Sequence, residues 1–111
     1  MVDQMDVVSV DLSQFGGPVF TGRPNGDAAR KKLGLDQIDT TIAKVVVTVP
    51  ADAYSLNSSF FLGLFGKSVR AAGSRDAFRN RFQFKSPEHL EAAIEVGIQR
   101  ALQERLPLIN R

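Results

Sequence analysis

The pattern of apolar and polar residues predicts strands that alternate with helices along this chain. Residues 7–12 are rich in β-branched side chains, which favours a short strand. Residues 19–21 have the same character, and the Gly-Gly-Pro turn at 16–18 predicts that the two strands form a hairpin. Ala43 to Val49 is almost continuously apolar, which is typical of a central strand covered on both faces.

Helical periodicity first appears after a turn-rich loop at residues 22–26. That loop leads into a short helix over 27–33, which a glycine ends. A longer helix over 58–72 carries a single apolar stripe. Gly63 and Gly66 lie inside this helix. Because a helical glycine costs about 1 kcal/mol relative to alanine, we expect another backbone to approach the helix closely there.

The C-terminal third of the chain predicts one more strand and the clearest helix. Residues 78–84 place phenylalanines on one side and polar, mostly basic residues on the other, as in a strand with one apolar and one basic face. Leu90 to Leu102 then follow the i, i+3, i+4 spacing of an amphipathic helix. Ser86 is its expected N-cap, Pro87 its expected first residue, and Pro107 closes it.

This order of elements predicts an α/β fold, with helices packed against a mostly parallel or mixed sheet of about four strands. A chain of 111 residues corresponds to a single domain, here 1–111 with a core at about 7–105. With 43% apolar residues the chain has enough material for a buried core, which argues against intrinsic disorder.

Composition excludes several classes of protein and site. The chain has no cysteine, so it holds neither a disulfide framework nor a thiolate metal site. His89 is the only histidine, which excludes a histidine-rich metal site; we expect it to be exposed in the first turn of the last helix. No phosphate-cradling Gly-rich loop or paired-carboxylate motif is present, so we expect no cofactor and no enzymatic activity. Without a secretory leader or a membrane-length apolar run, a cytoplasmic location is expected.

Positive charge is concentrated in one segment, although the whole chain carries a net charge of only +2. Residues 67–85 contain six basic residues and the single acid Asp76. The basic residues are Lys67, Arg70, Arg75, Arg79, Arg81 and Lys85. They form either an ordinary solvated face or a patch that attracts an acidic protein or nucleic acid. A nucleic-acid-binding module is therefore the alternative function.

The triplet Asn57-Ser58-Ser59 follows the strongest strand and opens an apolar helix. Its first interpretation is structural, because the free N–H groups of a helix start are commonly capped by Asn or Ser side chains. Its second is regulatory. A phosphate on a serine there would lie at the positive end of the helix dipole and would change the surface charge that a partner meets.

Three segments share their pattern with a known family; they are residues 8–12, residues 21–26 with Arg30 after them, and Ser58-Ser59-Phe60 followed by Leu64-Phe65-Gly66. Over about residues 7–105 the chain resembles the STAS domain, the fold of bacterial anti-anti-sigma factors. It is still more similar to a STAS-like domain family of unknown function found in bacteria. The resemblance implies a regulatory, protein-binding module rather than an enzyme.

The resemblance also implies a modification site and a partner. Ser59 matches the serine that an anti-sigma kinase phosphorylates in anti-anti-sigma proteins, and Ser58 stands beside it. The implied partner is a kinase-like ATPase of the anti-sigma type, with no cofactor. This sequence departs from those proteins at Asn57 and Phe60, where they carry Asp and Gly. It also has Leu62-Gly63 where the STAS-like family carries acidic residues.

Other candidate partner-binding residues each have two interpretations. Arg23 either pairs with an acid such as Asp27 or forms an anion-binding corner with Arg30. Phe60 lies off the apolar stripe of its helix, so it either covers a neighbouring loop or offers an aromatic anchor to a partner. Together with Asn57, these residues outline the expected binding surface around the two serines.

Overall fold

The computed structural model describes residues 6–15 and 17–104. Its elements, in chain order, are β1 (Val7–Asp11), the 3₁₀ helix η1 (Leu12–Phe15), β2 (Val19–Phe20), α1 (Arg23–Leu33), α2 (Leu35–Ile38), β3 (Lys44–Thr48), β4 (Ser55–Leu56), α3 (Ser58–Ala72), α4 (Arg75–Arg81), β5 (Phe82–Lys85), the 3₁₀ helix η2 (Glu88–Leu90) and α5 (Glu91–Glu104). The predicted α/β class is confirmed. The expected helix end at Pro107 lies outside the described residues.

Within the described residues, the strands form two parallel sheets rather than one mixed sheet of four. β1, β3 and β5 make a three-stranded sheet in that order, so the apolar strand β3 is central as predicted. The predicted hairpin is wrong, because β2 pairs in parallel with β4 in a separate two-stranded sheet. The physical reason is η1, which takes the chain away from β1 before β2 begins.

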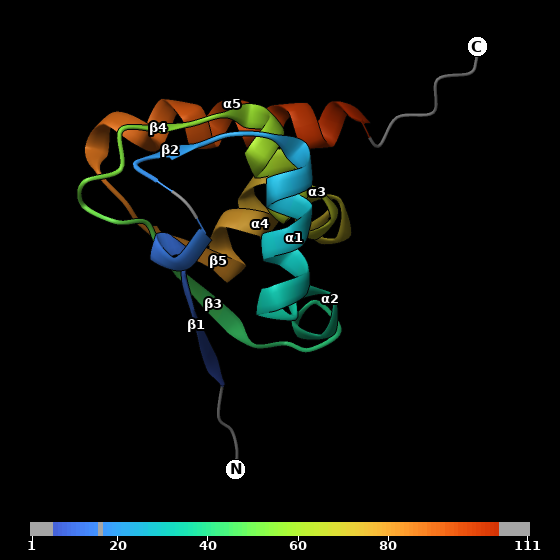
Figure 1. The fold of residues 1–111 in the computed structure, drawn as a ribbon. Helices are drawn as coiled ribbons and strands as arrows, with labels where there is room; N and C mark the ends of the chain where they lie inside the picture. Colours follow the sequence, from blue (N-terminus) through green and yellow to red (C-terminus); the bar gives the residue numbers. More distant parts are fainter. Residues whose placement is uncertain (1–5, 16, 105–111) are drawn as a thin grey trace.

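The three-stranded sheet buries only one of its faces. Val45 and Val47 of β3 are fully buried, and the register places Phe82 opposite Val45 on the same face. In Figure 1 the α-helices lie above and to the right of this sheet. Val46, which points to the opposite face, is only partly buried. The expectation of a strand covered on both faces is therefore wrong, since no described element packs over the second face.

Helix α3 is the centre of the packing and has the bounds that its sequence predicts. α1 and α5 both pack against it along their length. Phe61 and Phe65 of α3 are buried against Phe78 and Phe82, whose rings stack at a centroid distance of 4.6 Å. These aromatic contacts fill the space between α3 and the sheet.

Helix α1 begins at Arg23, so the loop expected over 22–26 is in fact the first turn of a helix. Gly22 has φ +94°, a conformation that glycine adopts without strain, and Pro24 suits the first helical turn. Gly26 lies where α1 crosses α3, and an added Cβ would lie 2.8 Å from the Leu64 nitrogen. Gly63 of α3 has the reciprocal environment, which confirms the predicted close approach of another backbone at this position. At Gly66 the expectation is wrong, because a Cβ there would meet only the side chain of Arg70.

The strand expected over 78–84 is a helix followed by a strand. Ser74 caps α4 by accepting a hydrogen bond from the Ala77 N–H at 3.1 Å, and the chain becomes extended only at Phe82. The expected cap of the last helix is also wrong, because Pro87 has ψ 142° and cannot be a helical residue. The short η2 follows Pro87, and α5 begins at Glu91.

Candidate functional site

The start of α3 presents two serines whose hydroxyl groups are not used to cap the helix. Asn57 is the N-cap, and its Oδ1 accepts a hydrogen bond from the Ser59 N–H at 2.7 Å. Ser58 and Ser59 are both half-buried, and neither hydroxyl makes a hydrogen bond with a described residue. The helix therefore fixes the position of both serine side chains, and their hydroxyl oxygens are not occupied by hydrogen bonds to described residues.

Phe60 is not an aromatic anchor on the surface. Its side chain is 0% exposed and packs against the Phe20 ring at a centroid distance of 5.4 Å. Of its two interpretations, the one that covers a neighbouring segment is correct, since Phe20 belongs to the loop-flanked strand β2. Any partner surface at the start of α3 is therefore formed without Phe60.

Arg30 does not form an anion-binding corner with Arg23, because it is buried and fully engaged within the fold. Its Nε donates to Asp36 at 2.8 Å and its second terminal nitrogen to Asp39 at 2.6 Å. The remaining terminal nitrogen donates to the Leu64 carbonyl at 2.9 Å and to Ser68 Oγ at 3.0 Å. The Arg30 cluster (Arg30, Asp36, Asp39, Ser68) joins α1 and α2 to α3.

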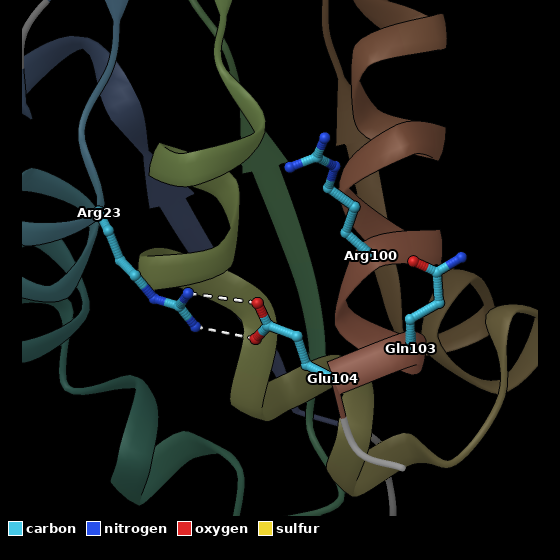
Figure 2. A pocket seen from close by; sticks show the side chains of 4 residues that line it. All are labelled: Arg23, Arg100, Gln103 and Glu104. Carbon is cyan, nitrogen blue, oxygen red and sulfur yellow. Dashed lines mark hydrogen bonds and ion pairs between the residues drawn. The ribbon is translucent and has the colours of Figure 1, made fainter. Parts of the chain in front are cut away.

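A groove lies between α1 and α5, with a cavity volume of about 580 Å³. It is lined by Arg23, Arg100, Gln103 and Glu104. Figure 2 shows Arg23 reaching across from α1 to make a two-pronged contact with the Glu104 carboxylate, at 2.9 and 3.3 Å. Arg23 therefore pairs with Glu104 rather than with Asp27 as its sequence neighbourhood suggested.

Electrostatics around Glu104 are dominated by arginines from three helices. The hydrogen bond from Arg23 lowers the pKa of Glu104, partial burial opposes that shift, and the charges of Arg23, Arg70 and Arg100 add to the lowering. The same hydrogen bond raises the pKa of Arg23. The sequence did not identify Arg100, Gln103 or Glu104, because they have the ordinary polar spacing of an exposed helix face.

The basic segment 67–85 is not an open cationic patch. Arg75 donates to both Glu95 oxygens at 2.8 Å, and Arg79 reaches Glu95 and Glu91 at 2.7 Å each. Arg70 lies 3.5 Å from Glu104. These partners, carboxylates from α5, neutralise most of the local charge in space.

Arg81 and the two lysines complete this segment. Arg81 donates to the main-chain oxygens of Ile38 and Ala43, at 2.6 and 2.9 Å, and so ties α4 to the chain before β3. Lys67 and Lys85 are exposed, and their ammonium groups make no hydrogen bond or ion pair with a described residue. Two lysines on separate elements do not make the continuous footprint expected of a nucleic-acid-binding surface.

Glu95 gives a test of these ion pairs through the pH dependence of stability. Its pKa is lowered to about 2, first by the hydrogen bonds from Arg75 and then, against partial desolvation, by Arg79. A folded-state pKa below the unfolded value means that the stabilisation is present above about pH 4.5 and is lost as the pH falls toward 2. We expect Glu95→Gln to flatten this part of the curve of unfolding free energy against pH. An unchanged curve would show that the pair contributes nothing to stability.

The part of the chain that the structure describes contains neither a cluster of metal-ligating side chains nor a helix of membrane-spanning character. None of its groups of three or more His, Asp or Glu side chains is arranged to hold a metal ion. His89 is exposed, as expected, but it lies in η2 rather than in the first turn of the last helix, and its Nε2 lies 3.0 Å from the Ala53 carbonyl oxygen. Across residues 6–15 and 17–104, the helices are too short or too polar to cross a membrane.

Comparison with protein-family models, with curated proteins and with solved structures gave no match for this chain. Its class is therefore defined by its own geometry. It is an α/β domain with two serines at the start of its central helix, whose hydroxyl groups make no hydrogen bond with a described residue. An arginine-lined groove lies beside that helix.

Proposed function

We propose that this chain is a non-enzymatic regulatory module of the STAS-like kind. It binds a protein partner through the surface at the start of α3, and its partner is a kinase-like ATPase of the anti-sigma type. Phosphorylation of Ser59, or of Ser58 beside it, switches the interaction. Asn57 contributes to the same surface, and Arg23 lies at its edge on the facing helix.

The observation that carries this proposal is that Asn57 caps α3, while the hydroxyl groups of Ser58 and Ser59 take no part in the cap. Because Asn57 supplies the capping oxygen, a phosphate on Ser59 does not remove the cap of the central helix. The half-buried position of both serines also keeps their hydroxyls at the surface while the backbone beneath them is fixed by the core.

A phosphate at this position is favourable for the fold itself. The positive end of the α3 dipole stabilises an added negative charge, by roughly 0.3–1 kcal/mol per charge at exposed sites. The first turn of α3, which is described in full, contains no acidic residue that would repel it. The added charge of about −1.5 to −2 therefore acts on the partner rather than on the domain.

The test is incubation of the full chain with its cognate kinase-like ATPase and ATP, followed by intact-mass measurement. We expect the mass increment of one phosphate, which Ser59→Ala or Ser58→Ala abolishes. Ser86→Ala is the matched control, since Ser86 is also half-buried and also makes no capping hydrogen bond, but lies outside α3. This variant should accept the phosphate like the parent chain. No phosphate on the parent chain, or one that survives both α3 variants, would contradict the switch.

A further inference from the structure

The groove between α1 and α5 contains more hydrogen-bond donors than its single carboxylate can satisfy. Arg23 already occupies both oxygens of Glu104. Arg70 approaches one of them at 3.5 Å, too far for a good hydrogen bond, and its Nη1 is buried without a hydrogen-bond partner among the described residues. An unsatisfied buried donor is unfavourable, and more so when it is charged. The groove therefore contains a buried arginine nitrogen that lacks a hydrogen-bond acceptor among the described residues.

Arg100, which lines the groove from α5, is a second arginine without an acceptor among the described residues. It makes no hydrogen bond or ion pair with a described residue and acts on Glu104 only through its charge. In Figure 2 its guanidinium extends from α5 into the space beside α3, away from the pair that Arg23 makes with Glu104. Asp27 is the other acid that acts on the charge of Arg23, and it is exposed on α1. The groove lining as a whole remains cationic.

We propose that this groove is an oxyanion-binding site for a phosphate monoester, and that Glu104 occupies the ligand's place until the ligand displaces it. A phosphate monoester has three terminal oxygens and a charge near −2 at neutral pH. It can therefore accept from Arg23 and Arg70, and from Arg100 once that exposed side chain turns toward them, which one carboxylate does not. The volume of about 580 Å³ leaves room for the group that carries the phosphate.

The Glu104 side chain can rotate out of the groove without entering a buried environment. It is 39% exposed, so rotation into solvent does not bury a charge. Arg23, whose side chain is 47% exposed, can keep its two-pronged geometry toward a phosphate, because guanidinium groups match carboxylate and phosphate oxygens equally well. Displacement therefore replaces the Glu104 carboxylate with a phosphate of higher negative charge, which the same arginine side chains bind.

Arg70, the residue that α3 contributes to this site, lies on the helix face that carries Ser59. Ser59, Gly66 and Arg70 recur at i, i+7 and i+11, so they share one face of α3. A Cβ at Gly66 would meet only the Arg70 guanidinium, at 3.2 Å from Nη1, which shows that Arg70 folds back over this glycine. Arg70 therefore lies on the same face of α3 as Ser59, about three turns further along the helix.

The experiment is titration of the full chain with inorganic phosphate, with phosphoserine and with adenosine monophosphate, followed by NMR of backbone amides and arginine Nε–H groups. We expect saturable shifts at Arg23, Arg70 and Arg100 with all three probes. The tighter of the two esters identifies the source of the phosphate, a modified protein or a free nucleotide. Chloride at matched ionic strength should produce no saturable shift.

Variants separate a binding site from general charge attraction. Arg100→Gln, at an exposed position, should weaken phosphate binding by about 10-fold, the value of one charge-assisted hydrogen bond. Glu104→Gln should tighten it, because the internal competitor is neutralised. Arg75→Gln, a matched arginine paired elsewhere, should leave it unchanged. The proposal is overturned if no probe saturates, or if Glu104→Gln weakens binding as Arg100→Gln does. The assay uses no kinase, so its failure is distinct from failure of the serine switch.

Discussion

Replacing Arg30 by methionine is expected to lower the free energy of unfolding by about 3–5 kcal/mol, the cost of leaving a buried ion pair with one partner. Methionine keeps most of the volume and the unbranched stem of arginine while removing the charge. Asp39, whose side chain is only 12% exposed, then loses its closest cation, and the Leu64 carbonyl loses a donor. Urea unfolding monitored by circular dichroism measures the change directly.

Two further variants show whether the effect belongs to the Arg30 cluster. Lys31→Met changes the next residue of α1, which is exposed, and should alter stability by no more than about 0.5 kcal/mol. Arg30→Met combined with Asp39→Asn should recover part of the loss, because the unpaired buried carboxylate is removed. Equal stability of Arg30→Met and Lys31→Met would show that the cluster is not a structural device.

The outcome for α3 shows where local sequence signals suffice. An N-cap side chain, an apolar stripe and a terminal glycine lie within one continuous segment, and together they predict the helix with its observed bounds. None of these signals depends on residues far away in the chain. The start of α1 was missed for the opposite reason. Gly26 serves a contact with α3, and the sequence shows such a glycine only as a turn residue.

The helix α4 illustrates an ambiguity in the pattern itself. Phe78 and Phe82 are four residues apart, a spacing that places them on one face in a helix and on one side in a strand. Of the two arginines between them, Arg79 pairs with Glu91 of α5, and Arg81 donates to main-chain oxygens of Ile38 and Ala43. Since such pairs are formed by the tertiary fold, the basic strand face expected from the sequence does not exist.

The residues of the candidate site also fall into two groups, those placed by local sequence signals and those placed by contacts with distant residues. The place of the two serines at the start of α3 was predicted, because the signals that begin a helix are local in the sequence. The roles of Arg23 and Arg30 were not, because each depends on a partner chosen by the packing of helices: Glu104 lies 81 residues from Arg23, and Ser68 lies 38 residues from Arg30. Charge alone indicates that an arginine needs an acceptor, but not whether that acceptor is a ligand or the fold.

Gly63→Ala is expected to destabilise the domain by about 1–3 kcal/mol, although alanine is the better helix former. A Cβ at this position would lie 2.8 Å from the Asp27 nitrogen and would also clash with the Arg23 carbonyl. Both are backbone atoms of α1, so the clash cannot be relieved by turning a side chain. The two helices must separate, which weakens the contacts along their whole crossing.

Gly66→Ala is the matched control on the same helix. Its Cβ would meet only the Arg70 guanidinium, the far end of a flexible side chain, so it should be neutral or stabilise by up to about 1 kcal/mol. The same chemical change therefore lowers stability at Gly63 and does not lower it at Gly66. Thermal and urea unfolding compare the two variants; equal effects would mean that α1 and α3 are not in backbone contact. Because α1 carries Arg23, only Gly63→Ala should also shift the Arg23 Nε–H signal, by pulling that side chain away from Glu104.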